Sequence, residues 1–180
     1  MKKTILTFGG IAGLVIGLFI LVIAWLCEKN PNFTGNEIVG YGAQIIAFSF
    51  IFVGVKNFRD KFNQGRLSFG KAFTIGLGIT LIGGTIYVLI WLVDFYVFIP
   101  DFMDKYAAHL QKDVKDSGVS QAVMDKKIAQ INGIKEMYKN PLFVILITYA
   151  EVLPVGLIIS LLTALILKRK HPRTQTPAAG

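Results

Sequence analysis

Two acidic residues lie inside long apolar stretches of the sequence, where a charge is costly. Glu151 follows Pro141 by ten residues, and Asp94 precedes Pro100 by six. An ionisable side chain within hydrocarbon is rare and is by default a candidate functional group. Two acids close together at low dielectric constant would share a proton or bind a cation. The chemistry that these residues suggest is therefore proton or cation binding.

Other polar and aromatic side chains fall at similar depths in the neighbouring apolar stretches. With Glu151 and Asp94 they could form an intramembrane polar cluster, whose further members would be Gln44, Tyr87, Trp91 and Tyr149. Two structural alternatives stay open. Glu151 could be protonated and hydrogen-bonded, or could pair with a helix of a partner protein. Asp94 could lie at the membrane interface if its helix projects beyond the bilayer.

The remaining reactive residues form no catalytic pattern. Ser68 and Lys71 fit an S-x-x-K motif, but the S-D-N and K-T-G motifs that should accompany it do not follow. His109 and His171 are far apart and fall on opposite sides of the predicted membrane, and the chain has a single cysteine. We therefore expect no enzymatic activity, no metal site and no cofactor.

The elements that must position these groups are four long apolar stretches. Each reaches or approaches the roughly 20 residues that a helix needs to cross about 30 Å of hydrocarbon. The expected transmembrane helices cover about 5–26, 38–55, 72–99 and 142–167. The sequence thus predicts an all-α polytopic protein of the lipid bilayer. Its four spans would form an antiparallel bundle in one domain, about residues 1–170.

Lys and Arg residues are distributed unequally between the two sides of this predicted membrane domain. The side with both termini carries eleven basic residues and one acid, Asp60, whereas the opposite side carries eight of each. Basic residues concentrate on the cytoplasmic side of membrane proteins. We therefore expect both termini in the cytoplasm of a bacterium, with the spans in its inner membrane. The net charge of +8 then reflects orientation and does not indicate nucleic-acid binding.

The basic inner face could hold an anionic lipid or an acidic partner protein. Its candidate residues are Lys56, Arg59, Lys61, Arg66, Lys168, Arg169 and Lys170. The polar segment 171–180, with two prolines, is expected to be a disordered cytoplasmic tail.

The connection between the third and fourth spans is long enough to fold by itself. Residues about 101–139 contain two helical apolar patterns separated by Ser117 and Gly118, which predicts an extracytoplasmic helical hairpin. Two interpretations remain open. The hairpin could be a lid on the ends of the spans, or a docking surface for a partner outside the cytoplasm.

Small residues recur at every fourth position in the first and fourth spans. Such stripes let two helices approach closely. We expect the two stripes to pack against each other, antiparallel, and the alternative is that one of them forms a homodimer interface. Pro154 should weaken or kink the fourth helix next to its stripe. The stripe residues are Gly9, Gly13 and Gly17 in the first span, and Gly156, Ser160 and Ala164 in the fourth.

Several local segments resemble one known family. They are Leu67-Ser68-Phe69-Gly70-Lys71-Ala72-Phe73, Ile99-Pro100-Asp101-Phe102, Asn140-Pro141 and the run from Glu151 to Leu161. Over about residues 2–170 the chain resembles the bacterial membrane proteins of the domain of unknown function 4199 family. The resemblance implies a four-helix inner-membrane protein of Gram-negative bacteria, and it implies no activity.

Two functional hypotheses follow. The first is a non-enzymatic scaffold or accessory subunit that binds a partner protein or lipid. The second is a small transporter or proton- or cation-binding protein that uses Glu151. Because four spans are few for a transporter, the second hypothesis needs a homo-oligomer.

Overall fold

The computed structural model describes residues 1–29 and 37–169 of the chain. Within these residues the regular secondary structure is helical, which confirms the predicted all-α class. Two short π-helical segments, η1 (Phe58–Phe62) and η2 (Asp94–Phe98), continue α2 and α3. The α-helices are α1 (Lys2–Lys29), α2 (Glu37–Asn57), α3 (Phe69–Val93), α4 (Phe102–Asp116), α5 (Gln121–Met137) and α6 (Pro141–Leu167). The predicted tail 171–180 and Lys170 lie outside the described residues.

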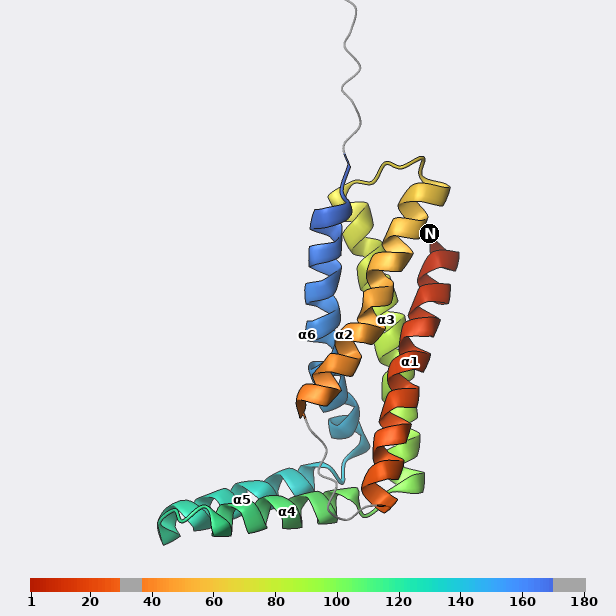
Figure 1. Ribbon diagram of the computed structural model, residues 1–180. Coiled ribbons are helices and arrows are strands. Elements are labelled where there is room, and N and C mark those ends of the chain that lie inside the picture. Colours follow the sequence, from red (N-terminus) through yellow and green to blue (C-terminus); the bar gives the residue numbers. More distant parts are fainter. Residues whose placement is uncertain (30–36, 170–180) are drawn as a thin grey trace, which may run out of the picture.

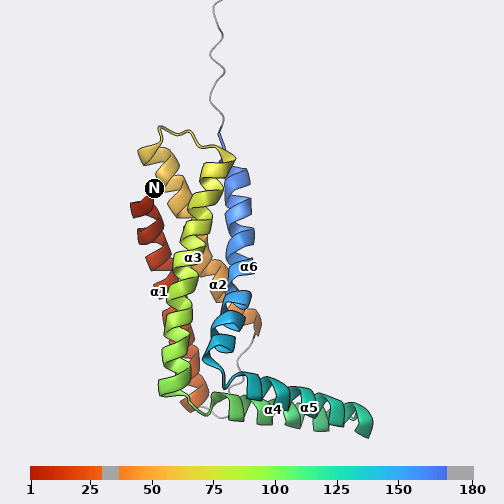
Figure 2. The same cartoon turned by 180° about the vertical axis from the view of Figure 1, so that it is seen from behind.

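Four helical segments are long and apolar enough to cross a membrane, as predicted. They cover Lys2–Leu26, Val39–Phe62, Phe69–Phe98 and Pro141–Leu167 and lie side by side along a common direction (Figures 1 and 2). The second span is longer than predicted, because the helix continues beyond the apolar run. The added segment is η1, which contains the polar residues Arg59, Asp60 and Lys61. The N-terminus and the end of α6 lie at the same end of the spans.

Helix α3 is the helix on which α1 packs. The three glycines of the α1 stripe each face an isoleucine of α3. A Cβ atom added at Gly13 would lie 2.6 Å from the Cβ of Ile86 and 3.0 Å from the carbonyl oxygen of Gly83. Gly9 and Gly17 face Ile82 and Ile90 in the same way. The stripe therefore accommodates branched side chains that stand out from α3.

The stripe of α6 also packs on α3. A Cβ atom at Gly156 would clash with Thr80, and one at Gly76 would meet Ser160 at 3.0 Å. The hydroxyls of Thr80 and Ser160 lie 3.1 Å apart, and Ala164 is fully buried. The predicted direct pairing of the two stripes is therefore wrong. Because α3 has small residues of its own, it approaches both helices closely.

Helix α6 continues through Pro154. The helix runs from Pro141 to Leu167 without interruption, so the proline does not divide the span into two helices. The helix begins sharply, since the Asn140 side chain accepts a hydrogen bond from the Leu142 amide at 3.0 Å.

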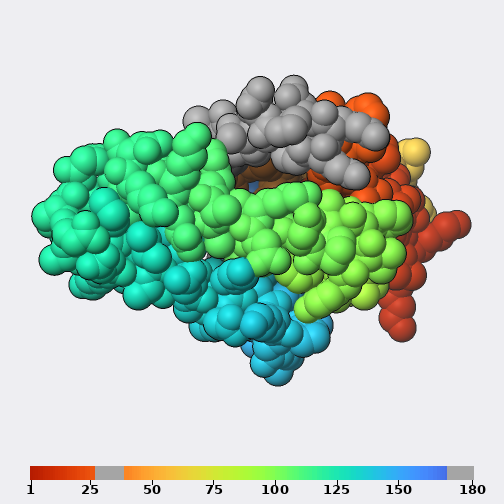
Figure 3. All heavy atoms as spheres, turned by 90° about the horizontal axis from the view of Figure 1, so that it is seen from below, coloured from red at the N-terminus to blue at the C-terminus, as the bar shows by residue number. Residues whose placement is uncertain are grey.

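The predicted hairpin is present as α4 and α5. It starts at the end of the spans opposite the N-terminus and runs crosswise to them, projecting to one side (Figure 1). Seen from that end, most of the hairpin extends past the spans (Figure 3). The interpretation as a lid on the span ends is therefore wrong for most of its length, because α4 and α5 pack mainly on each other.

Only the root of the hairpin packs against the spans, through aromatic rings. The ring of Phe95 lies 5.9 Å from that of Tyr138 and 6.2 Å from that of Phe102. Trp91 meets Phe102 edge to face at 5.3 Å, and Val144 is buried in the same cluster. Offset and edge-to-face pairs of this kind hold a junction in a defined geometry.

Candidate functional site

The loop before α3 and the end of α6 are joined by backbone hydrogen bonds. The amide of Arg169 donates to the carbonyl oxygen of Leu67 at 2.8 Å, and the amide of Leu67 donates back at 3.3 Å. Gln64 and Gly65 form the turn of this loop with positive φ angles of 51° and 73°. Ser68 then caps α3, because its hydroxyl accepts from the Lys71 amide at 3.4 Å. The sequence thus places two basic segments side by side.

A cavity of about 610 Å³ opens between these two segments. Of the described residues that line it, four are basic and none is acidic. The lining residues are Asn63, Arg66, Leu67, Ser68, Phe69, Lys71, Lys168 and Arg169. We call this cavity the basic pocket.

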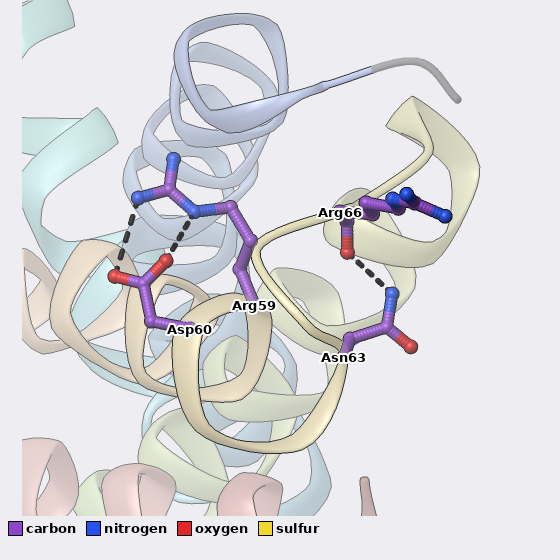
Figure 4. A network of polar contacts seen from close by, with 4 residues as sticks. All are labelled: Arg59, Asp60, Asn63 and Arg66. Atoms are coloured by element: carbon purple, nitrogen blue, oxygen red, sulfur yellow. Dashed lines mark hydrogen bonds and ion pairs between the residues drawn. The ribbon is translucent and has the colours of Figure 1, made fainter. Parts of the chain in front are cut away.

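Local contacts orient the side chains around the basic pocket. The Lys71 ammonium donates to the Asn63 side-chain oxygen at 3.0 Å and lies 5.2 Å from the centre of the Phe58 ring. The Asn63 amide donates to the carbonyl oxygen of Arg66 (Figure 4). The floor of the pocket is therefore built by the loop itself, and the basic residues around it are exposed.

The acid Asp60 is paired mainly with Arg59 and interacts more weakly with Arg169 of the basic pocket. Its carboxylate accepts two hydrogen bonds from Arg59, at 2.7 and 3.2 Å (Figure 4). A bidentate pair of this kind satisfies the carboxylate with one guanidinium. The charge of the pocket itself thus comes from Arg66, Lys71, Lys168 and Arg169, with the capped start of α3 beside them. Such a site suits a phosphate or carboxylate group.

The predicted basic inner face includes some of the residues that line this pocket. Arg66, Lys168 and Arg169 line the pocket, whereas Lys56 and Lys61 are not among its lining residues. Lys71 and Ser68 were not among the residues predicted for the basic inner face; they were considered as an S-x-x-K motif and as part of the segment that resembles the family. The signal that could have placed them there is a serine three residues before Lys71 at the start of an apolar run, which is typical of a helix N-cap.

A second polar site lies within the spans, between α2 and α6. The Gln44 side-chain amide donates to a carboxylate oxygen of Glu151 at 3.1 Å. Gln44 is only 3% exposed, and its own side-chain oxygen has no hydrogen-bond partner among the described residues. Glu151, by contrast, is exposed on the protein surface. The structure thus brings together Gln44 of α2 and Glu151 of α6, two members of the predicted cluster.

The other predicted members occupy different contacts. The hydroxyl of Tyr149 lies 2.9 Å from that of Thr85, so this pair joins α6 to α3. Tyr87 is buried in the main apolar core of the spans, within electrostatic range of Glu151. Trp91 belongs to the aromatic root of the hairpin.

Asp94 lies away from Glu151. Gly84 of α3 faces Val152 of α6, so Asp94 is about nine residues, or roughly 13 Å, closer to the hairpin than Glu151 is. The Asp94 side chain is 2% exposed beside the buried Phe95, and one of its oxygens has no partner among the described residues. The two acids therefore do not share one site, and Asp94 belongs to the buried hairpin root.

The sequence matches a known protein family over most of its length. The family model described as "Protein of unknown function (DUF4199)" matches residues 7–169. The chain belongs to the DUF4199 family. Neither the curated proteins nor the solved structures gave a match. For this DUF4199 protein, family membership confirms the resemblance found in the sequence and brings no activity with it, so function must be argued from the two sites.

Proposed function

We propose that this DUF4199 protein is a non-enzymatic scaffold or accessory subunit that binds an acidic partner in the basic pocket. The partner would be an anionic lipid or an acidic segment of a membrane-associated protein. The observation that supports this function is the cavity itself, with four basic side chains around it and Asp60 held by Arg59.

The proposed location is the inner membrane of a bacterium, with both termini in the cytoplasm. Support comes from the unequal distribution of Lys and Arg, which gather at the end of the spans that carries the N-terminus, the loop before α3 and the end of α6. In this orientation the basic pocket faces the anionic lipids of the cytoplasmic leaflet.

The expected strength of binding fits a partner that is already at the membrane. A basic residue close to an anionic leaflet contributes about 1 kcal/mol, so four contribute about 4 kcal/mol. That free energy corresponds to a dissociation constant of about 1 mM. The pocket would retain a lipid headgroup or a tethered acidic segment, whereas a dilute soluble ligand would not be captured.

Native mass spectrometry of the protein in mild detergent that contains millimolar phosphatidylglycerol tests this function, because a ligand with a dissociation constant of about 1 mM stays bound only while it is supplied at that concentration. We expect phosphatidylglycerol, or a stoichiometric protein partner, to be bound to the unmodified chain. The double variant Arg66→Glu, Arg169→Glu should reduce that occupancy at least roughly tenfold, because it replaces two attractive contacts by repulsive ones.

The matched control is Lys56→Glu, Lys61→Glu, which changes the charge of the same end of the molecule equally but outside the pocket lining. It should leave occupancy nearly unchanged. Recovery of the unmodified protein with neither an anionic lipid nor a protein partner would refute the function. Equal loss in both double variants would also refute it, because the binding would then depend on the total charge rather than on the pocket.

We propose proton or cation binding by a homo-oligomer as the second candidate function. It is supported by the hydrogen bond between Gln44 and Glu151 and by the unpartnered oxygen of Gln44. A second copy placed over the exposed Glu151 would complete the site. Uptake of protons, Na⁺ or K⁺ into proteoliposomes should then require Glu151 and be abolished by Glu151→Gln. Uptake that is unchanged in this variant, or absent from both proteins, would remove this candidate.

A further inference from the structure

The hairpin α4–α5 carries an apolar side that its own packing does not use. Four large apolar side chains in residues 101–139 are exposed by 43–46%. They are Tyr106 on α4, and Val123, Ile134 and Met137 on α5. The three on α5 are separated by 11 and 3 residues, which places them on one side of a helix. Lys127 and Gln130 lie between them on the same side.

A different side of α5 holds the hairpin together. Met124, Ile128 and Ile131 of α5 are half-buried, as are Leu110 and Val114 of α4. The Asn132 side chain accepts from Gln111 at 2.9 Å, and Lys135 forms an ion pair with Asp104. The exposed apolar side is therefore additional to the interface between α4 and α5.

The right-handed sense of the α-helix determines the direction in which the exposed apolar side of α5 points. In Figure 1, α4 lies nearer the reader than α5, and α5 runs from the hairpin tip back toward the spans. Viewed along that direction, a right-handed helix turns clockwise by about 100° per residue. With Ile128 and Ile131 directed at α4, Ile134 and Met137 point to the side of the hairpin on which the spans lie. Asp125 and Glu136 then point to the opposite side.

The same construction applied to α4 gives a matching result. Leu110 is half-buried and the adjacent Gln111 is hydrogen-bonded to Asn132 of α5. With these two residues directed at α5, Tyr106 is turned toward the spans as well. The exposed apolar side chains of both helices thus share one surface of the hairpin. This surface is directed toward the level of the spans, beside α6 (Figures 1 and 2). Leu142 and Leu146, at the end of α6 next to the hairpin, are themselves exposed apolar residues.

We propose that this side of the hairpin lies on the bilayer, with Tyr106, Val123, Ile134 and Met137 inserted at the boundary between headgroups and acyl chains. The lipid contact of α6 at Leu142 and Leu146 would then continue without a break onto the hairpin. Interfacial helices carry an apolar side toward the acyl chains and a polar side toward water. Lys127 can extend its ammonium to a phosphate while its stem stays in contact with lipid.

Lipid is the occupant that the geometry favours over a second copy of the chain. The apolar side faces the space beside the spans, and in a membrane that space is filled by the leaflet. A second copy would have to enter between the hairpin and the lipid. The proposal holds whichever side of the membrane carries the hairpin, so it is independent of the proposed function.

Site-directed spin labelling of the full-length chain in vesicles of phosphatidylcholine and phosphatidylglycerol tests the proposal. In a Cys27→Ser background, a label at Ile134→Cys is compared with one at Glu136→Cys on the opposite side of α5. The ratio of collision rates with oxygen and with a water-soluble nickel complex should be roughly tenfold higher at position 134, as expected for a side chain inserted at the acyl boundary. A second pair, Val123→Cys and Asp125→Cys near the tip, should show the same difference.

Two results would overturn the proposal. Equal access of the nickel complex to both positions of each pair would place the hairpin in water. Shielding of positions 123 and 134 from both oxygen and nickel would show that protein covers this side instead. The two pairs guard against a single misfolded variant, and the labels at positions 125 and 136 report whether the helix has formed.

Discussion

The glycines of α1 determine how closely that helix approaches α3. At Gly13 an added Cβ atom would lie within 2.6 Å of the Ile86 side chain, and this neighbour cannot retreat easily because it is β-branched. At Gly10, one position outside the stripe, nothing lies within 4 Å of the added atom. Two glycines only three residues apart therefore have very different steric environments.

This difference predicts the effect of side chains at the two positions. Gly13→Leu should lower the free energy of unfolding in detergent by about 1–3 kcal/mol, because the larger residue overpacks the contact between α1 and α3. Gly10→Leu is the matched control and should change it little. Comparable losses in both variants would show that α1 packs on α3 through a different face.

Gln44 is a buried amide that makes one observed hydrogen bond. Interhelical hydrogen bonds within membranes contribute on average only about 0.6 kcal/mol. In Gln44→Met this bond is lost together with the unpartnered oxygen, while the side-chain volume is nearly kept. We therefore predict a change in unfolding free energy of less than about 1 kcal/mol in either direction. A much larger loss would mean that the Gln44–Glu151 pair is a structural element of the spans.

The hairpin makes few contacts with the rest of the molecule. Its stability therefore depends mainly on the contacts between α4 and α5. Lys135 of α5 pairs with Asp104 of α4, whereas Lys139 pairs with Glu136 only three residues before it. Lys135→Gln should therefore speed amide hydrogen exchange throughout α4 and α5, and Lys139→Gln should not. Identical exchange in the two variants would contradict a role for the ion pair between helices.

The pH dependence of the hairpin follows from the same ion pair. The hydrogen bond to Asp104 raises the pKa of the Lys135 ammonium above its ordinary value. The stabilisation is therefore fully present below the ordinary pKa of lysine, about 10.4, and is lost as the pH rises through the raised value. Amide exchange in the hairpin, corrected for its intrinsic pH dependence, should accelerate in that alkaline range, and the acceleration should be absent in Lys135→Gln.

For the whole molecule, the arrangement of the spans predicts where its ends lie in the cell. A fluorescent reporter that matures only in the cytoplasm should be active when fused after Gly180, and an alkaline phosphatase inserted at Gly118 should be active outside the cytoplasm. The reason is that the basic end of the spans is expected to remain inside. Phosphatase activity at the C-terminus and none at Gly118 would reverse the proposed orientation.

The sequence alone determined the four spans, the hairpin and the family. Peptide groups in hydrocarbon must be hydrogen-bonded within the chain, so a long apolar stretch can only cross as a helix, and its length is visible in the sequence. The break at Ser117 and Gly118 and the helical patterns on either side made the hairpin equally predictable. The connection between Gln44 and Glu151 was also foreseen, because both lie at similar depths.

Only the tertiary structure decided which surfaces meet. A stripe of small residues shows that some helix approaches closely but does not identify that helix, so the pairing of Gly13 with Ile86 and of Gly156 with Thr80 was not predictable. Asp94 and Glu151 differ in depth by an amount that depends on how α3 and α6 are aligned. The basic pocket joins residues about 100 positions apart, and the direction of the hairpin depends on the packing of Phe95 against Phe102 and Tyr138. Each of these features depends on contacts between distant segments, which local patterns of apolar and polar residues do not specify.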